Sequence, residues 1–131
     1  MLKVVFDTNI FVSGIIWQGL PGEALANWLS NKIELVISRQ ILEELTNTLR
    51  RLDVPEEKVN VLLNQILGKA TIVDPQIKVN LVKKDPSDNK FLECAIEGKV
   101  GYVISGDKHL LEIKKINGIQ IISARKLLEL L

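Results

Sequence analysis

The sequence predicts an α/β fold, a three-layer α/β/α sandwich with a central, mainly parallel sheet. Short apolar, β-branched runs alternate with longer runs whose apolar residues recur at helical spacing. The strand-like runs are apolar throughout, as strands are when helices cover both faces of a parallel sheet. The chain has 131 residues, of which 47% are hydrophobic and 25% charged, so a single globular domain over residues 1–131 is expected.

In the first half of the chain, predicted strands and helices alternate from the start. The expected elements are a strand at 2–6, a helix at 22–31, a strand at 33–37, a helix after Ser38 and a helix at 54–69. Ser38 is a good N-cap, and the helix after it carries an apolar stripe from Ile41 to Leu52. Pro55 opens the next helix, which is expected to end near Gly68.

The second half continues the alternation after a less regular stretch that begins at Pro75. The expected elements are extended segments at 70–74 and 77–82, a helix at 85–99, a strand at 101–105, a short helix at 107–113, a strand at 119–123 and a helix at 124–131. Gly98 is expected to end the first of these helices.

Polar side chains follow two of the predicted strands directly. Asp7 and Asn9 come after the first strand, and Ser105 and Asp107 come at the end of the strand at 101–105. In parallel α/β sheets, ligands bind at the carboxyl ends of the strands. These side chains are therefore candidates for a shared site.

Two further aspartates lie in the segment DPSDNKFLECA at 85–95. Asp85 precedes Pro86, which suits the first position of a helix, so Asp85 is expected to be the N-cap with Asp88 at N3. Asp88 also lies on the face that carries Phe91 and Leu92. A carboxylate at the end of a buried stripe is costly unless it is paired or binds a cation. The spacing leaves both roles of Asp88 open, helix cap and ligand.

The helix after Ser38 contributes two adjacent glutamates. At about 100° per residue, Glu44 lies about 110° from the centre of the apolar stripe and Glu43 about 150° from it. Glu44 is thus the better placed to reach a cleft, although a solvated helix face remains the alternative for both.

Asp7, Glu44, Asp88 and Asp107 are together expected to converge at one edge of the sheet. Close carboxylates repel one another unless cations lie between them, and oxygen ligands select Mg²⁺ or Mn²⁺. Such ions activate water and stabilise the leaving oxygen in phosphoryl transfer. No His or Cys cluster suits zinc: His109, the single histidine, is expected at the surface, and Cys94 is expected to be buried and inert.

The net charge of +1 provides no global attraction for nucleic acid, so contacts to any polyanion need a local basic patch. The candidates, each of which is also compatible with ordinary solvation, are Lys83, Lys84, Lys108, Arg39 and the pair Arg50 and Arg51. No apolar run is long enough to span a membrane, and a lone cysteine fits a reducing, cytoplasmic compartment.

Four segments in order, VVFDTNIFVSG, SRQILEELTNTL, DPSDNKFLECA and YVISGDKHLL, resemble the PIN-domain family and its VapC-like toxins. The resemblance implies a PIN fold and a ribonuclease that depends on Mg²⁺ or Mn²⁺. It maps the acidic residues of the family to Asp7, Glu44, Asp88 and Asp107, with Asn9 and Ser105 in support. It also suggests a separate antitoxin chain and a homodimer. The dimer would use surplus apolar groups at Ile16, Trp17 and Leu20, with Trp17 expected on a loop.

Two other functions are compatible with these features. One is an RNA- or protein-binding module that has the same fold but no turnover. The other is an aspartate-nucleophile phosphatase with Asp7 as the nucleophile. Such an enzyme needs a second aspartate two residues later as general acid, and this chain has Asn9 there.

Overall fold

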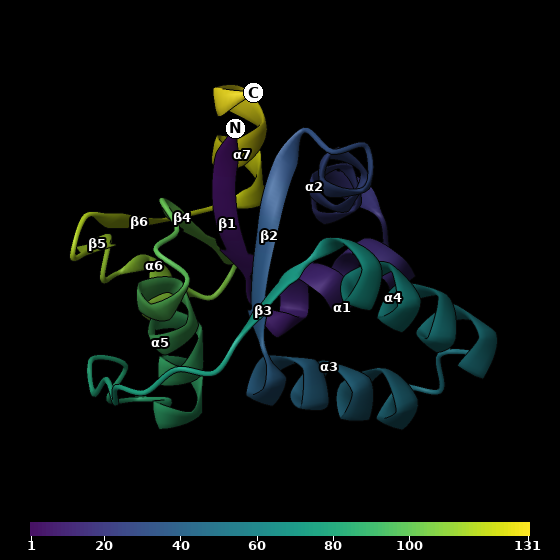
Figure 1. Ribbon diagram of the computed structural model, residues 1–131, viewed down its shortest axis with the longest axis horizontal. Coiled ribbons are helices and arrows are strands. Elements are labelled where there is room, and N and C mark those ends of the chain that lie inside the picture. Colours follow the sequence, from purple (N-terminus) through teal and green to yellow (C-terminus); the bar gives the residue numbers. More distant parts are fainter.

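A six-stranded sheet forms the centre of the computed structural model, which describes residues 1–131 (Figure 1). Its strands are β1 (Leu2–Phe6), β2 (Ile33–Ser38), β3 (Thr71–Val73), β4 (Tyr102–Ile104), β5 (Lys115–Ile116) and β6 (Ile119–Ile122). The order across the sheet is β3-β2-β1-β4-β6-β5, and every neighbouring pair is parallel except β5 with β6. The prediction of a mainly parallel sheet is confirmed.

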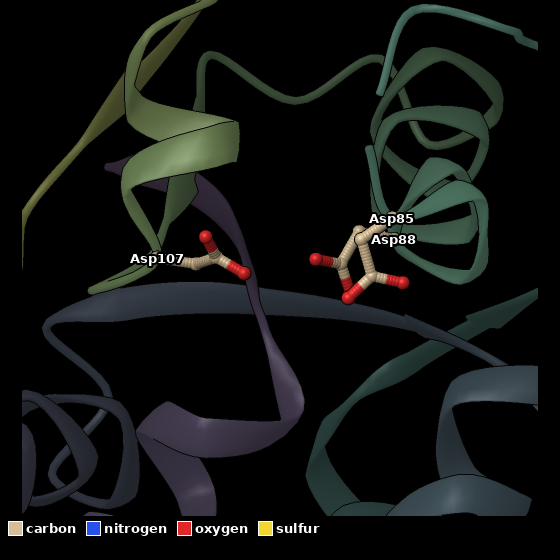
Figure 2. Close-up of side chains that lie close together, drawn as sticks. All are labelled: Asp85, Asp88 and Asp107. Carbon is tan, nitrogen blue, oxygen red and sulfur yellow. The ribbon is translucent and has the colours of Figure 1, made fainter. Parts of the chain in front are cut away.

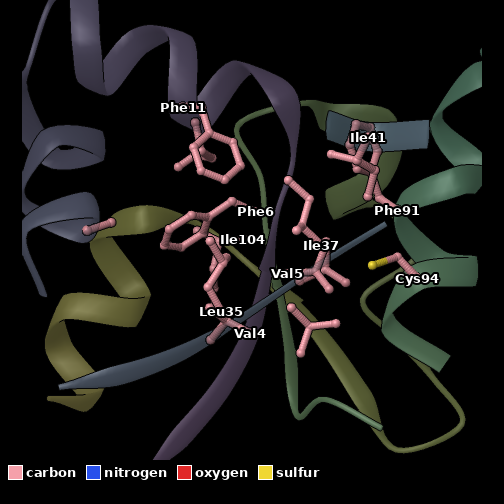
Figure 3. Close-up of a cluster of buried hydrophobic side chains, with 14 of the residues drawn as sticks. Val4, Val5, Phe6, Phe11, Leu35, Ile37, Ile41, Phe91, Cys94 and Ile104 are labelled. Carbon is pink, nitrogen blue, oxygen red and sulfur yellow. The ribbon is translucent and has the colours of Figure 1, made fainter. Parts of the chain in front are cut away.

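Helices cover both faces of this sheet, as predicted. They are α1 (Thr8–Ile16), α2 (Gly19–Leu29), α3 (Arg39–Arg51), α4 (Glu56–Lys69), α5 (Asn89–Glu97), α6 (Lys108–Leu111) and α7 (Ala124–Leu130), with a 3₁₀ turn, η1 (Pro86–Asp88), before α5. Figure 3 shows the two apolar layers, with Phe6 and Phe11 on the α1 side and Phe91 and Cys94 on the α5 side. None of the helices combines the length and apolarity needed to cross a bilayer.

The core is continuous through the sheet. The middle of β1 and β2, including Val5 and Ile37, is buried on both faces. Cys94 is fully buried on α5, as predicted, and this burial raises the pKa of its thiol to about 12. The thiol therefore stays protonated and unreactive at neutral pH.

Helix α1 was not predicted, because the apolar residues among 8–16 show no helical period. It starts directly after β1, where the Asp7 carboxylate accepts a hydrogen bond from the Ile10 amide (2.9 Å). Phe11 then packs edge-on against Phe6, with ring centroids 5.4 Å apart. Trp17 is the C-cap of this helix rather than part of a longer loop, and its side chain is 80% exposed.

The close packing of α1 on α2 depends on a glycine. A Cβ atom added at Gly14 would lie 2.5 Å from the Leu25 side chain. Helix α2 begins at Gly19, three residues before its predicted start at Gly22, because the chain turns back immediately after α1.

The extended segment predicted at 77–82 is not a strand. Residues 76–82, here called the strap, run along α5, and side chains of α5 accept the hydrogen bonds of the strap's backbone. The bonds join Gln76 N to Glu97 Oε1 (3.1 Å), Val79 N to Glu93 Oε2 (2.9 Å) and Val82 N to Asn89 Oδ1 (2.9 Å). These acceptors recur every four residues on one face of α5 and replace a strand partner. The strap leads directly to Asp85.

A short hairpin at the far edge of the sheet was also not predicted. Strand β5 pairs antiparallel with β6 across Asn117 and Gly118, which both have positive φ (49° and 80°). An Asn-Gly turn of this kind joins two antiparallel strands without strain. The Asn-Gly pair, a typical hairpin turn, is present in the sequence. The strand before it, β5, is only two residues long and is therefore too short to be recognised from its pattern.

Candidate metal centre

Asp7 lies at the carboxyl end of β1 and is 3% exposed. One of its carboxylate oxygens accepts from the Ile10 amide, and the other accepts from the Ser105 hydroxyl at the end of β4. Burial raises the pKa of Asp7 to about 6, although the bonds from Ser105 and Ile10 oppose the rise and the charges of Asp107 and Glu44 add to it. The carboxylate is therefore held in one orientation beside other acids.

Asp107 is joined to Asp7 through the same serine. Its backbone amide donates to Ser105 Oγ (2.9 Å), and its carboxylate accepts from the His109 amide (2.8 Å), which makes it the N-cap of α6. Because β1 and β4 are parallel neighbours, their carboxyl ends bring Asp7, Ser105 and Asp107 together, as the strand order requires.

Asp85 and Asp88 do not form the predicted capping box. Neither side chain accepts a hydrogen bond from a helix amide; Asp85 instead accepts from the Ser87 hydroxyl (2.6 Å). The helix starts four residues later than predicted because a 3₁₀ turn intervenes at Pro86–Asp88, so Asp88 precedes the first residue of α5. Both carboxylates are left available for other partners.

The two aspartates of η1 face Asp107 across the edge of the sheet (Figure 2). One carboxylate oxygen from each of Asp85, Asp88 and Asp107 lies within 4.8 Å of the others. The pKa of Asp88 rises to about 7, first because the group is partly buried, then through a hydrogen bond with Asp107 and the charges of Asp85 and Asp107; Lys90 lowers it.

This oxygen-only cluster fits a hard divalent cation. Three carboxylates converge, two of the four predicted acids have raised pKa values, and no thiol or imidazole joins them. A cation bound between the carboxylates would offset both the burial of Asp88 and the repulsion from Asp85 and Asp107, the causes that raise its pKa.

Glu44 lies nearby but has a partner of its own. Its carboxylate, 37% exposed, forms an ion pair with Lys90, whose side chain is 7% exposed on the first turn of α5. Glu43 is exposed on the same helix. Glu44 thus points toward the interior and Glu43 toward solvent, as their positions on the helix predicted. The ion pair of Glu44 with Lys90 joins α3 to α5.

The remaining predicted residues are distributed around this edge. Asn9 is exposed on the first turn of α1 and its side chain makes no hydrogen bond. Lys83, Lys84 and His109 line a hollow of about 260 Å³ next to Asp85. His109 is half-buried, with its Nδ1 atom enclosed and unbonded, and is not the surface group that was expected.

Two of the predicted RNA contacts have acidic partners instead. Arg39 pairs with Asp74 (3.1 Å) and Arg50 with Glu56 (2.8 Å), both at exposed positions. Lys108 is exposed at the start of α6, adjacent in the chain to Asp107. Lys83, Lys84, Lys108 and Arg51, the other basic residues of the predicted set, are exposed and form no ion pair.

The sequence did not predict the contributions of Asp85 and Lys90. Asp85 was interpreted as a helix cap, and a signal against this was Ser87, whose hydroxyl competes for the carboxylate. Nothing in the spacing marks Lys90 as buried, because the residue adjoins polar Asn89 at the start of a helix.

Comparison with known proteins agrees with this geometry. The family model described as PIN domain matches residues 3–109. The chain belongs to the PIN-domain family. PIN domains are generally nucleases, and the acidic edge of this chain lies within the matched region.

Individual relatives of this PIN domain are distant. MJ1680, an uncharacterized protein of Methanocaldococcus jannaschii, is 34% identical over 132 aligned positions, covering 92% of this chain and 84% of that protein. The crystal structure of VapBC2 from Rickettsia felis, bound to a DNA fragment from its promoter, matches with a TM-score of 0.63 at 18% identity, over 93% of this chain and 98% of the other.

A second solved structure, the PIN domain endonuclease Utp24, matches with a TM-score of 0.56 at 21% identity, over 92% of this chain and 84% of that one. At these identities the structural matches establish the shared fold of the PIN domain and leave its substrate open.

Proposed function

We propose that this PIN domain, acting as one domain over residues 1–131, is an endoribonuclease that depends on Mg²⁺ or Mn²⁺. The observation that carries the proposal is the convergence of Asp85, Asp88 and Asp107, none of which is neutralised by a basic side chain within the cluster. A divalent cation bound there supplies activation of water and stabilisation of charge on a phosphodiester.

The acids of the site have different tasks in this proposal. Asp88 and Asp107 hold the cation, with Asp85 beside them, and Asp7, whose pKa the charge of Asp107 helps to raise, completes the set next to Asp107. Ser105 fixes the Asp7 carboxylate and, through the Asp107 amide, the start of α6. Glu44, the fourth predicted acid, belongs to the same site and is linked to it through Lys90. Asn9 is retained as a supporting polar group at the exposed rim.

RNA is proposed as the substrate because a basic hollow adjoins the acidic edge. Lys83 and Lys84 lie immediately before Asp85 in the chain and are exposed, so they can hold phosphates of a strand that enters the acidic edge. Lys108 adds a third exposed charge.

We further propose that the protein acts in the cytoplasm as the toxin of a toxin–antitoxin pair. Support comes from the similarity to VapBC2, whose solved structure contains a DNA fragment from its promoter. Expression of this chain should then arrest growth, and co-expression of a separate antitoxin encoded next to it should relieve the arrest. Growth that is unaffected by the active chain would contradict the toxin assignment.

A homodimer is proposed from exposed apolar groups at the end of α1. Trp17 is 80% exposed and Ile16 is 38% exposed, with Leu20 partly buried beside them. Water contact of such a patch is unfavourable unless another chain covers it. Sedimentation at micromolar concentration tests this, and a species of 14.7 kDa alone would refute the dimer.

The test of the enzymatic proposal uses two substrates with one protein preparation. With Mn²⁺, the protein should cleave single-stranded RNA internally and leave para-nitrophenyl phosphate intact. Hydrolysis of the ester alone would indicate a phosphatase. RNA binding without cleavage at any Mg²⁺ or Mn²⁺ concentration would indicate a binding module instead.

A further inference from the structure

Lys90 is the one lysine of the chain that is buried. Its ammonium group has three partners: the Glu44 carboxylate, the Ser87 carbonyl oxygen (2.5 Å) and the face of the Phe91 ring (5.1 Å from the centroid). A buried ammonium is tolerated only when it is paired in this way. Because its hydrogen-bonding capacity is used inside the protein, Lys90 is not placed to contact a substrate.

The pair lies against the acidic edge rather than apart from it. Ser87 stands between Asp85 and Asp88, so the Lys90 ammonium is anchored to the same turn that carries both carboxylates. Its charge acts on Asp88, whose pKa it lowers, and its partner Glu44 comes from α3, which packs on α5. A fixed positive charge is therefore built in beside the cluster of Asp85, Asp88 and Asp107.

Glu44 has its carboxylate directed to this ammonium, and it is not one of the three acids whose oxygens converge. To coordinate a second cation, Glu44 would have to leave Lys90 buried without a counter-ion, which is strongly unfavourable. A second divalent ion would also lie next to an ammonium group and be repelled by it.

We propose that Lys90 takes the place of a second metal ion, so that the site binds a single divalent cation and Glu44 acts as the partner of Lys90 rather than as a metal ligand. The inference rests on the proposed metal-dependent function. It makes Lys90 and Glu44 positioning residues: they fix the Asp85–Asp88 turn and supply a permanent charge near it, without touching RNA or metal.

Isothermal titration calorimetry with Mn²⁺ tests the proposal on the whole, metal-stripped chain, independently of any activity. The wild-type protein should bind one Mn²⁺ per chain. Glu44→Gln should keep that stoichiometry and an affinity within about threefold, whereas Asp107→Asn should weaken binding by at least about tenfold, since Asp107, unlike Glu44, is a ligand in this proposal. Glu43→Gln is the matched control on the same helix.

Lys90→Gln should release Glu44 and remove the fixed charge, so that Mn²⁺ binds more tightly or a second ion appears, while Lys90→Arg should retain one ion. Circular dichroism and melting identify any variant that fails to fold. The number of Mn²⁺ ions bound by the wild-type chain, which needs no variant, keeps the test decisive if Glu44→Gln or Lys90→Gln does not fold.

Two Mn²⁺ ions per wild-type chain with similar affinity, or a loss in Glu44→Gln as large as in Asp107→Asn, would overturn the inference and leave the proposed nuclease standing. Wild-type protein that binds no Mn²⁺ would overturn both.

Discussion

The acidic edge has two halves that are built differently. In the sheet half, Asp7 and Asp107 follow parallel strands, and each carboxylate caps a helix while Ser105 links the two residues. In the turn half, Asp85 and Asp88 project from η1, and neither caps a helix. The first half is fixed by the same hydrogen bonds that start α1 and α6. The second half is held by residues that lie outside it: Lys90 bonds to the Ser87 carbonyl, and Asn89 joins the strap to Pro86.

The difference between the two halves shows which aspartates stabilise the fold and which one is costly to it unless a metal binds. An aspartate that caps a helix is stabilising whether or not it binds a metal. A partly buried aspartate that caps nothing and faces two other acids is destabilising until a cation arrives. Of the four predicted acids, Asp88 therefore provides the clearest evidence for a metal site, and the predictions below separate the two halves.

The largest expected effect is on catalysis. Replacing Asp88 or Asp107 by asparagine should lower metal-dependent RNA cleavage by at least about a hundredfold, on the order of 2.7 kcal/mol in the barrier, because each change removes a ligand charge. Asp7→Asn should abolish cleavage as well. Single-turnover rates measure this, with Glu43→Gln as the control. Wild-type rates in any two of the three variants would refute the assignment.

Support of the turn half by the strap is tested at Asn89. Its side-chain amide accepts from the Leu81 and Val82 amides and donates to the Pro86 carbonyl (3.0 Å). Asn89→Ala leaves these buried groups unsatisfied and should lower the free energy of unfolding by roughly 2 kcal/mol. Chemical denaturation measures the loss. A change below about 0.5 kcal/mol would mean that the strap does not hold the turn.

A smaller effect on catalysis is expected at Glu44. Glu44→Gln removes the counter-ion of Lys90 and should slow single-turnover cleavage at saturating Mn²⁺ by at least about tenfold, on the order of 1.4 kcal/mol. Glu43→Gln, one position away on the same helix and exposed, should cleave at nearly the wild-type rate. The reverse ranking would place the wrong glutamate at the site.

The smallest effects concern stability and pH. The pKa values of Asp7 and Asp88 rise from 3.8 to about 6 and about 7 in the folded protein. Since the folded state then binds protons more tightly than the unfolded state, these two groups lower stability as the pH rises from about 4 to about 7, and the loss is complete above that range.

In EDTA, Asp88→Asn should therefore melt higher than wild type at pH 8, with a smaller difference at pH 5. Millimolar Mn²⁺ should raise the melting temperature of the wild type more at pH 8 than at pH 5, because the cation binds the ionised carboxylates of the folded state. Differential scanning fluorimetry measures both differences. Melting that is independent of metal at pH 8 would contradict a cation site at this edge.

The sequence was sufficient for the parts of the fold that follow from periodicity. The parallel strands, the stripe of α3 and the acids after β1 and β4 were predicted because apolar spacing and strand order place them. Helix α1 was missed because an apolar segment without period does not distinguish helix from loop. The segment at 77–82 was predicted only as extended, and its role as the strap could not be predicted because its hydrogen-bond acceptors are distant side chains on α5.

The site was predictable to the same extent. Asp7, Ser105 and Asp107 were found because they end strands, which is a local signal. The predicted role of Asp85 as a helix cap depended on whether a 3₁₀ turn precedes α5, and the burial of Lys90 depended on where α3 lies. Both depend on the tertiary structure and cannot be predicted from the spacing of residues in the sequence.

The central claim, that this edge holds a cation that the cleavage of RNA requires, is tested most directly with the wild-type protein alone. A fluorescently labelled single-stranded RNA is incubated with excess protein that has been stripped with EDTA, and Mn²⁺ is then titrated in. The account predicts no cleavage before the addition, internal cleavage whose rate saturates with Mn²⁺, and loss of cleavage when EDTA is restored. Cleavage that persists in EDTA, or an intact RNA at every Mn²⁺ concentration, would contradict it.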